Sequence, residues 1–275
     1  MTSIKDDIAQ EIFRRRDMRE PLTFTIDPAD AKDFDDALSF ESLGDGLYQI
    51  GVHIADVTHY VQPDTDIDDE AYRRGTTIYE VNRVTPMLPE RLCNDLCSLR
   101  PNEDKLCMSV IFTMTADAKV VKHKICRTVI RSDFRLTYEQ AQSILDGEED
   151  PLPLYSSTPL LPQLAEALRE LNLMALSLRQ RRIAAGALCL DKEEPRFLLD
   201  KKGHPTAIYF EAPTPAHHLI EEFMLLANRT IAKQVGALPF VYRVHDLPNQ
   251  EKMRQVERFK RKMKDRVRPE VIDLL

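Results

Sequence analysis

The chain has 275 residues, of which 43% are hydrophobic and 30% are charged, proportions typical of a soluble globular protein. It has no apolar run of the ~20 residues that a transmembrane helix needs, and residues 1–17 lack the apolar core of a secretory signal. Five scattered cysteines indicate reduced thiols in a cytoplasmic protein rather than a disulfide framework. A formal net charge of −7 argues against a simple basic nucleic-acid-binding protein.

The first half of the chain predicts short strands. Residues 1–20 are charged and offer little apolar surface, so we expect a short helix or linker that leads into a domain spanning residues 21–275. Runs rich in β-branched and aromatic residues then predict strands at 24–26, 37–40, 47–54 and 57–61. The sequence Gly44-Asp45-Gly46 predicts a hairpin turn. Two longer strands are expected within residues 108–134, around a turn near Ala116–Lys119.

The second half predicts mainly helices. Leucines recur at helical spacing over residues 161–185, and Gly186 marks the end of that helix. Further helices are predicted at 138–145, 215–235 and 250–264, the last of them basic, with a surface loop at 146–160 and a strand at 240–245. Strands mixed with long helices indicate one mixed α/β (α+β) domain, in which helices pack on a mixed sheet.

One segment concentrates the negative charge. Residues 21–70 contain 13 acidic residues and a single lysine, so the rest of the chain is mildly basic. Five of the carboxylates lie close together: Asp27, Asp30, Asp33, Asp35 and Asp36. Carboxylates this close repel one another, so they lie either on a solvated polar loop or beside cations that neutralise them. Their oxygens are ligands suited to Mg²⁺ or Mn²⁺, so a divalent-metal site and a polar loop stay open as alternatives.

Two other features have structural interpretations. His217 and His218 precede Glu221 and Glu222 by four residues, so each pair shares a helix face. The order differs from the H-E-x-x-H of zinc hydrolases, and we expect helix surface or core residues rather than metal ligands. Asp56 follows a predicted strand, and we expect it to anchor a turn through hydrogen bonds.

Several longer segments resemble one known family. These segments are TFTIDPADAKDFDDALSF, GVHIADVTHYVQP, RRGTTIY, RVTPMLPERLCNDLCSLRPNEDKL and HHLIEEFMLLAN, in this order. Together they resemble the RNB-type catalytic domain of the RNase II/RNase R exoribonucleases, and bacterial RNase R is the nearer likeness. The resemblance runs from about Asp17 to at least Asp246. It implies an RNB-like fold, of which this chain holds the N-terminal major part.

The resemblance implies a reaction and a cofactor. Family members degrade RNA hydrolytically and processively from the 3′ end to nucleoside 5′-monophosphates. The four family aspartates that build the Mg²⁺ site fall here on Asp27, Asp33, Asp35 and Asp36, which would be both catalytic and metal-binding; Mn²⁺ is an alternative ion. Two cations would clamp the scissile phosphate and activate the attacking water. Asp30 lies outside these four, and we expect it to be solvated.

Three further residues match family positions that contact RNA. Tyr79 matches a tyrosine that stacks on a base near the 3′ end, and Tyr138 matches a second tyrosine near the terminal nucleotide. Glu221 matches a glutamate near the terminal ribose hydroxyls, which distinguish RNA from DNA. We therefore expect a monomer that binds the 3′ end of single-stranded RNA and no membrane.

The family also has parts that this sequence does not contain. Family members carry OB-fold RNA-binding domains on both sides, and an arginine that grips the terminal phosphates lies beyond the position of Leu275. We expect an RNB domain that is incomplete at its C-terminus, association with a segment supplying the missing part, and little turnover by this chain alone. Two other functions stay open: a truncated, non-catalytic module that binds metal, RNA or protein, and a phosphodiesterase acting on small nucleotides.

Overall fold

The structure is a computed structural model, and it describes residues 4–81, 83–148, 152, 155, 158–187, 193–236, 239–242, 244 and 249–263. The chain divides into two compact units, residues 1–231 and residues 232–275. The residues expected to form the site all belong to the larger unit. Among the described residues, no helix combines the length and the apolar character that a membrane crossing requires.

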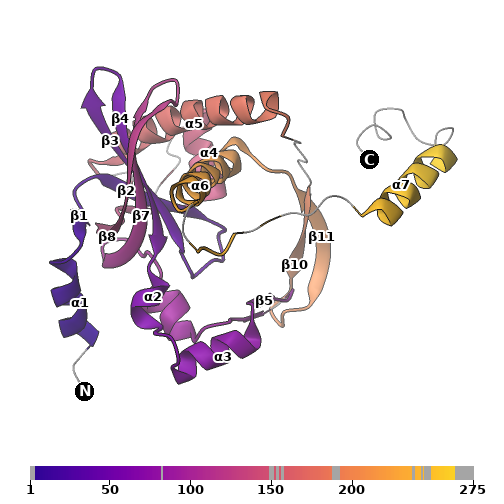
Figure 1. The fold of residues 1–275 in the computed structure, drawn as a ribbon, viewed down its shortest axis with the longest axis horizontal. Coiled ribbons are helices and arrows are strands. Elements are labelled where there is room, and N and C mark those ends of the chain that lie inside the picture. Colours follow the sequence, from indigo (N-terminus) through magenta and orange to yellow (C-terminus); the bar gives the residue numbers. More distant parts are fainter. Residues whose placement is uncertain are drawn as a thin grey trace. The chain divides into compact units, whose positions relative to one another are not determined.

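A seven-stranded mixed sheet lies at the centre of the larger unit, in the order β1-β8-β7-β4-β3-β2-β9 (Figure 1). Its strands are β1 (Arg16–Met18), β2 (Leu22–Asp27), β3 (Asp36–Gly44), β4 (Leu47–Ala55), β7 (Asp104–Thr115), β8 (Val120–Arg131) and β9 (Phe134–Thr137). The five inner strands pair in antiparallel fashion, whereas β1 and β9 add in parallel at the two edges. A mixed sheet covered by helices confirms the expected α+β class.

Most of the sheet was predicted from the sequence. Strands β2, β3, β4, β7 and β8 lie on the expected ranges, and β3 turns into β4 at residues 44–46, which all have positive φ. Such a backbone favours glycine, which explains the Gly-Asp-Gly sequence there. The N-terminal segment forms helix α1 (Ile4–Ile12) and then contributes strand β1 to the sheet.

Three helices pack with the sheet into one apolar core: α4 (Tyr138–Asp146), α5 (Leu161–Ala184) and α6 (Pro215–Gln234). They confirm the three helices predicted for this part of the chain. Leu164, Leu168 and Leu171 of α5 are fully buried, as their helical spacing predicts. The residue that follows the helix end, Gly186, has a φ of 95° and so terminates the helix.

A second apolar core, separate from the first, holds the loop between β2 and β3. It includes Phe34 of that loop, Leu92 of the π-helical turn η1 (Leu92–Leu96), and Leu99. The strand predicted at residues 57–61 is wrong, because residues 57–60 form the short helix α2 (Val57–Tyr60). Helix α3 (Asp66–Arg74) follows, with the Thr65 side chain accepting a hydrogen bond at its start.

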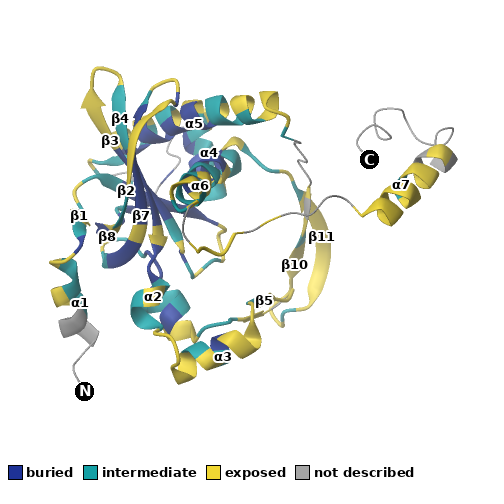
Figure 2. Ribbon diagram, in the orientation of Figure 1, coloured by how far each residue is buried: buried dark blue, intermediate teal, exposed yellow. Residues whose placement is uncertain are grey.

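Two small sheets were not predicted. Strands β5 (Ile78–Tyr79) and β6 (Val84–Thr85) form one hairpin, and β10 (Glu194–Leu199) and β11 (Pro205–Glu211) form the other. The β10–β11 hairpin is largely exposed (Figure 2). In the smaller unit, α7 (Gln250–Met263) confirms the basic helix. The strand predicted at 240–245 is wrong for the residues described there, 240–242 and 244, which have no regular structure.

Candidate functional site

The acidic residues lie on a loop between two neighbouring strands. Asp27 is the last residue of β2 and Asp36 is the first residue of β3. The two strands are antiparallel, with Phe24 opposite Leu38, so Asp27 and Asp36 both lie at the end of the sheet where β2 and β3 separate. We call the connecting segment, residues 28–35, the acidic loop. It places Asp33 and Asp35 between the two strand-end aspartates in sequence.

Ser98 fixes the backbone of the acidic loop from one side. Its Oγ accepts a hydrogen bond from the Phe34 N–H (3.0 Å) and donates one to the Lys32 carbonyl (2.9 Å). The next residue, Leu99, donates its N–H to the Phe34 carbonyl (2.8 Å). The ring of Phe34 is buried between these contacts. The aspartates that flank Phe34 are therefore attached to a backbone with a defined conformation.

Arg135 of β9 holds the other side of the loop. Its guanidinium donates to the Pro28 carbonyl (2.7 Å) and to the Ala29 carbonyl (3.1 Å), and it lies 5.2 Å from the centre of the Phe34 ring. Since the arginine binds carbonyls, it contributes positive charge near the loop without occupying a carboxylate. The sequence analysis identified neither Ser98 nor Arg135, because both act on the loop from more than 60 residues away.

Two of the aspartates are held in an environment that opposes their charge. Asp27 is 8% exposed, and burial together with the negative charges of Asp36 and Asp33 raises its pKa to about 7. Burial and the charge of Asp35 raise the pKa of Asp36 to about 6. The Oδ2 atom of Asp27 is buried and has no hydrogen-bond partner. A buried carboxylate oxygen without a partner is costly unless a cation or a proton satisfies it.

The donor chemistry of the loop fits a hard divalent cation, because all four predicted ligands are carboxylates. In the part of the chain that the structure describes, however, no three His, Cys, Asp or Glu side chains gather closely enough to hold a metal ion. The four aspartates therefore influence one another electrostatically without converging on one point. Asp30 is exposed, as expected for a residue outside the set.

Tyr138 lies beside the strand-end aspartates. Asp27 of β2 is in register with Thr137 of β9, and Tyr138 follows as the first residue of α4. Burial and the negative charges of Asp36 and Asp27 raise the pKa of Tyr138 to about 12. Its ring stacks on that of His217 at the start of α6, with centroids 3.8 Å apart and planes 6° from parallel. His217 was expected on a helix surface or in the core, and this contact was not predicted.

Tyr79 lies on the exposed side of the same loop. It belongs to the small β5–β6 hairpin and is 70% exposed. Partial burial and the charges of Asp33 and Asp35 raise its pKa. The two predicted tyrosines thus feel different aspartates: Tyr138 the strand-end residues Asp27 and Asp36, and Tyr79 the loop residues Asp33 and Asp35.

Glu221 does not join the acidic loop through any described contact. It forms ion pairs with two arginines of α5, Arg182 (3.1 Å) and Arg179 (3.6 Å). The neighbouring Glu222 is 3% exposed and pairs with Arg182 at 2.5 Å. Glu221 nevertheless lies one helical turn beyond His217 on the same face of α6. It is therefore a neighbour of the histidine that stacks on Tyr138.

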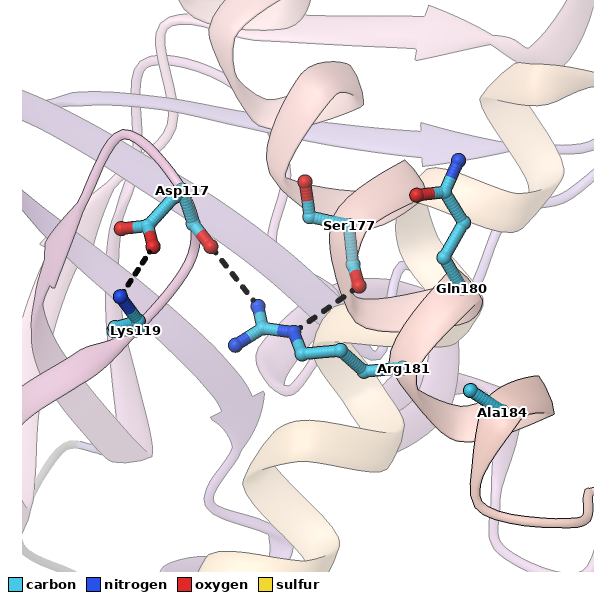
Figure 3. Close-up of a pocket in the computed structure, with 6 residues that line it drawn as sticks. All are labelled: Asp117, Lys119, Ser177, Gln180, Arg181 and Ala184. Carbon is cyan, nitrogen blue, oxygen red and sulfur yellow. Dashed lines mark hydrogen bonds and ion pairs between the residues drawn. The ribbon is translucent and has the colours of Figure 1, made fainter.

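A separate hollow of about 380 Å³ lies between the β7–β8 turn and α5 (Figure 3). Arg181 donates to the carbonyls of Asp117 (3.1 Å) and Ala118 (2.7 Å), and Lys119 pairs with Asp117 (2.8 Å). This hollow adjoins the end of β7 at Thr115, whereas the acidic loop lies near the opposite end, beside Ala55 and Cys107. The cationic groups of this hollow already bind protein oxygens, and the hollow is not part of the candidate site.

Comparison with known proteins identifies relatives over most of the chain. A family described as "RNB domain" matches residues 15–273. Ribonuclease R of Aquifex aeolicus is 43% identical over 246 residues, which cover 89% of this chain and 34% of that protein. A protein of Arabidopsis thaliana named "Inactive exonuclease DIS3L2" is 37% identical and covers 91% of this chain, with 24% of its own length matched.

A solved structure shows the same fold. Mycoplasma genitalium RNase R, in complex with ribose-methylated single-stranded RNA, superimposes with a TM-score of 0.80 and 26% identity over 94% of this chain and 41% of that one. This chain spans about a third of the length of the curated ribonuclease R relatives it matches.

Proposed function

The chain belongs to the RNB domain family, and from this premise we propose that it carries the active site of a magnesium-dependent 3′→5′ exoribonuclease. The products would be nucleoside 5′-monophosphates. One observation in the structure supports this proposal above others: Asp27 and Asp36 lie at the same end of β2 and β3, and Asp27 has a buried oxygen without a partner. A site of this kind needs positive charge, and the substrate phosphate cannot supply it.

We assign the metal ligands to Asp27, Asp33, Asp35 and Asp36. A bound Mg²⁺ or Mn²⁺ would offset the carboxylate charges, polarise the scissile phosphate and lower the pKa of the attacking water. The backbone contacts of Ser98 and Arg135 hold the loop in place, and none of these contacts uses an aspartate side chain. Arg135 also limits the repulsion among the aspartates without competing for their oxygens.

The RNA would approach with its 3′ end at the acidic loop. Tyr138 would contact the terminal nucleotide on the buried side, and Tyr79 would stack on a base on the exposed side, where its ring is accessible. Glu221 would contact the terminal ribose hydroxyls after release from Arg182. The chain acts as a monomer in this proposal, in the cytosol, and a further protein segment supplies contacts to the terminal phosphates.

The relative named inactive favours one alternative, a module that binds metal, RNA or protein without cleaving RNA. The two functions differ in one assay. Excess protein, 5′-labelled single-stranded RNA and Mg²⁺ should give a ladder of shortening products under single-turnover conditions, which detect slow cleavage. Asp36→Asn should abolish the ladder and Asp30→Asn should retain it. Binding of RNA without any ladder would favour the non-catalytic module.

A further inference from the structure

The stack of Tyr138 and His217 is built from the first turns of two helices. Tyr138 is the first residue of α4, directly after Thr137, whose side chain forms a capping box with Gln140. His217 is the third residue of α6, which begins at Pro215. Each ring therefore stands at a helix start whose backbone is fixed by its own hydrogen bonds.

His217 is itself held by the residue before α6. Its Nδ1 accepts a hydrogen bond from the Thr214 N–H (3.2 Å) and lies 2.8 Å from Thr214 Oγ1. In a capping box, a Glu or Gln at the third helical position accepts this same N–H, so the histidine takes that role here. A backbone N–H can only donate, so Nδ1 carries no proton and the ring is a neutral imidazole with its proton on Nε2.

The two helix starts are also joined to each other. Gln142, one turn after Tyr138 in α4, accepts a hydrogen bond from the Ala216 N–H of α6 (3.2 Å). The ring stack therefore has three supports: a cap on each helix and a bond between the helices. Contacts supported in this way fix the plane of the Tyr138 ring before any ligand arrives.

We propose that His217 is a positioning residue that holds the Tyr138 ring at the acidic loop, so that the terminal base of the RNA meets an aromatic ring of fixed orientation. This rests on the proposed function for the role of Tyr138 toward RNA. The physical gain is preorganisation, because a ring that is already ordered loses less entropy when a base stacks or packs against it. His217 acts through Tyr138 and does not itself contact RNA.

Proton NMR of the metal-free protein tests the ring contact without any need for activity. Tyr138→Phe identifies the Tyr138 ring resonances, which the stacked imidazole should shift upfield. His217→Ala should remove that shift and His217→Phe should keep a comparable one. His59→Ala is the matched control, because His59 meets Tyr60 edge-on, with ring centroids 4.9 Å apart. Unchanged Tyr138 resonances in His217→Ala would overturn the proposal.

A double-mutant cycle on RNA affinity tests whether the two rings act as one unit. Fluorescence anisotropy with a 2′-O-methylated single-stranded RNA and Mg²⁺ measures Kd for wild type, Tyr138→Ala, His217→Ala and the double variant. Each single change should weaken binding about tenfold, as expected for loss of one aromatic contact to a base. The double variant should be no weaker than either single variant, and His217→Phe should restore most of the affinity.

Multiplicative losses in the double variant would overturn the positioning role, since they would show that His217 acts independently of Tyr138. No RNA binding by the wild type would instead refute the proposed function. The NMR comparison would then still decide whether His217 orders the Tyr138 ring.

Discussion

A buried carboxylate without a partner is an unfavourable feature in a folded protein, and Asp27 has this feature next to a second half-buried aspartate. The neighbouring Asp30 belongs to the same sequence cluster but is exposed. Substitution of a half-buried aspartate and substitution of the exposed Asp30 therefore distinguish cation binding at the site from a general effect of cations on acidic residues.

Millimolar Mg²⁺ or Mn²⁺ should raise the melting temperature of the wild type, because a ligand that binds only the native state stabilises it by mass action. Asp36→Asn should lose most of this shift, and Asp30→Asn should keep it. Differential scanning fluorimetry across a metal titration gives the measurement. Equal shifts for all three proteins would indicate non-specific screening rather than a site.

Asp56 shows a second kind of buried charge, one that lies beside an opposite charge. Burial alone would raise its pKa, but hydrogen bonds from Thr58 (2.6 Å) and Arg15 hold that pKa below its ordinary value. Arg15 lies 2.8 Å from Asp56 and is itself buried. The pair connects the N-terminal segment to the start of α2, and it confirms the anchoring role expected for Asp56.

Asp56→Asn should lower the free energy of unfolding by about 1.5–3 kcal/mol, because the buried Arg15 charge loses one of its two acidic partners and keeps only Glu11, at 2.9 Å. Asp17→Asn, which removes the partly exposed partner of Arg19, should cost at most about 1 kcal/mol. Urea unfolding at neutral pH compares the two variants. A similar small loss in both would mean that water reaches Arg15.

At the scale of elements, four strands are tied together by a polar network inside the sheet. His53 of β4 is fully buried, with Nδ1 2.7 Å from Ser109 Oγ and Nε2 2.9 Å from Ser39 Oγ. Ser109 in turn lies 2.6 Å from Thr128 Oγ1 of β8. A Cβ on Gly51 would lie 2.3 Å from His53 Nε2, so only glycine leaves room for the imidazole.

This network makes the sheet sensitive to acid. Burial lowers the pKa of His53 from 6.5 to about 3. Between these two pH values, His53 is therefore protonated in the unfolded chain and neutral in the folded chain. Stability from His53 is fully present above pH 6.5 and is lost as the pH falls toward 3. Between pH 7 and pH 4.5 the wild type should lose about 2–3 kcal/mol relative to His53→Gln, measured by urea unfolding.

Comparing the two proteins at each pH cancels the contributions of Asp27 and Asp36. These contributions have the opposite sign, because raised carboxyl pKa values favour the folded state as the pH falls. Parallel pH curves for wild type and His53→Gln would show that His53 does not titrate differently in the two states.

The sequence predicted those elements whose pattern is local. The leucine spacing of α5 and the Gly-Asp-Gly turn between β3 and β4 are both patterns contained within a short stretch of sequence. Residues 57–60 carry a strand-like composition, but they form a short helix directly after Asp56, whose partner Arg15 is distant in sequence. Strand β1 was missed because its three residues, Arg16–Met18, become a strand only by pairing with β8.

The site was predictable to a similar extent. The spacing of the aspartates identified the loop, but the residues that hold it, Ser98 and Arg135, are ordinary in sequence and are recognised only by their contacts. The same is true of His217, whose role depends on the approach of α4 and α6.

At the scale of the whole molecule, the two units differ in how they use their apolar residues. Phe223 of α6 is fully buried in the main core, whereas Phe259 of α7 is 49% exposed. Helix α7 is basic and carries exposed apolar residues.

Phe223→Ala should lower the free energy of unfolding by about 3–5 kcal/mol, since it removes a buried ring and leaves a cavity. Phe259→Ala should leave the main thermal transition unchanged. Circular dichroism melting of both variants checks this contrast. A loss of melting temperature in Phe259→Ala as large as that in Phe223→Ala would contradict this contrast.

Strand β9 also determines when the acidic loop takes shape during protein synthesis. The bond from Arg135 to Pro28 spans 107 residues of sequence, and the bond from Ser98 to Lys32 spans 66. Contacts of such separation form late, because long loops must close before the contacts can stabilise them. A nascent chain that has not yet reached β9 therefore lacks the contacts of Arg135 to the acidic loop. Most of the sheet is therefore synthesised before the acidic loop can acquire its complete set of backbone contacts.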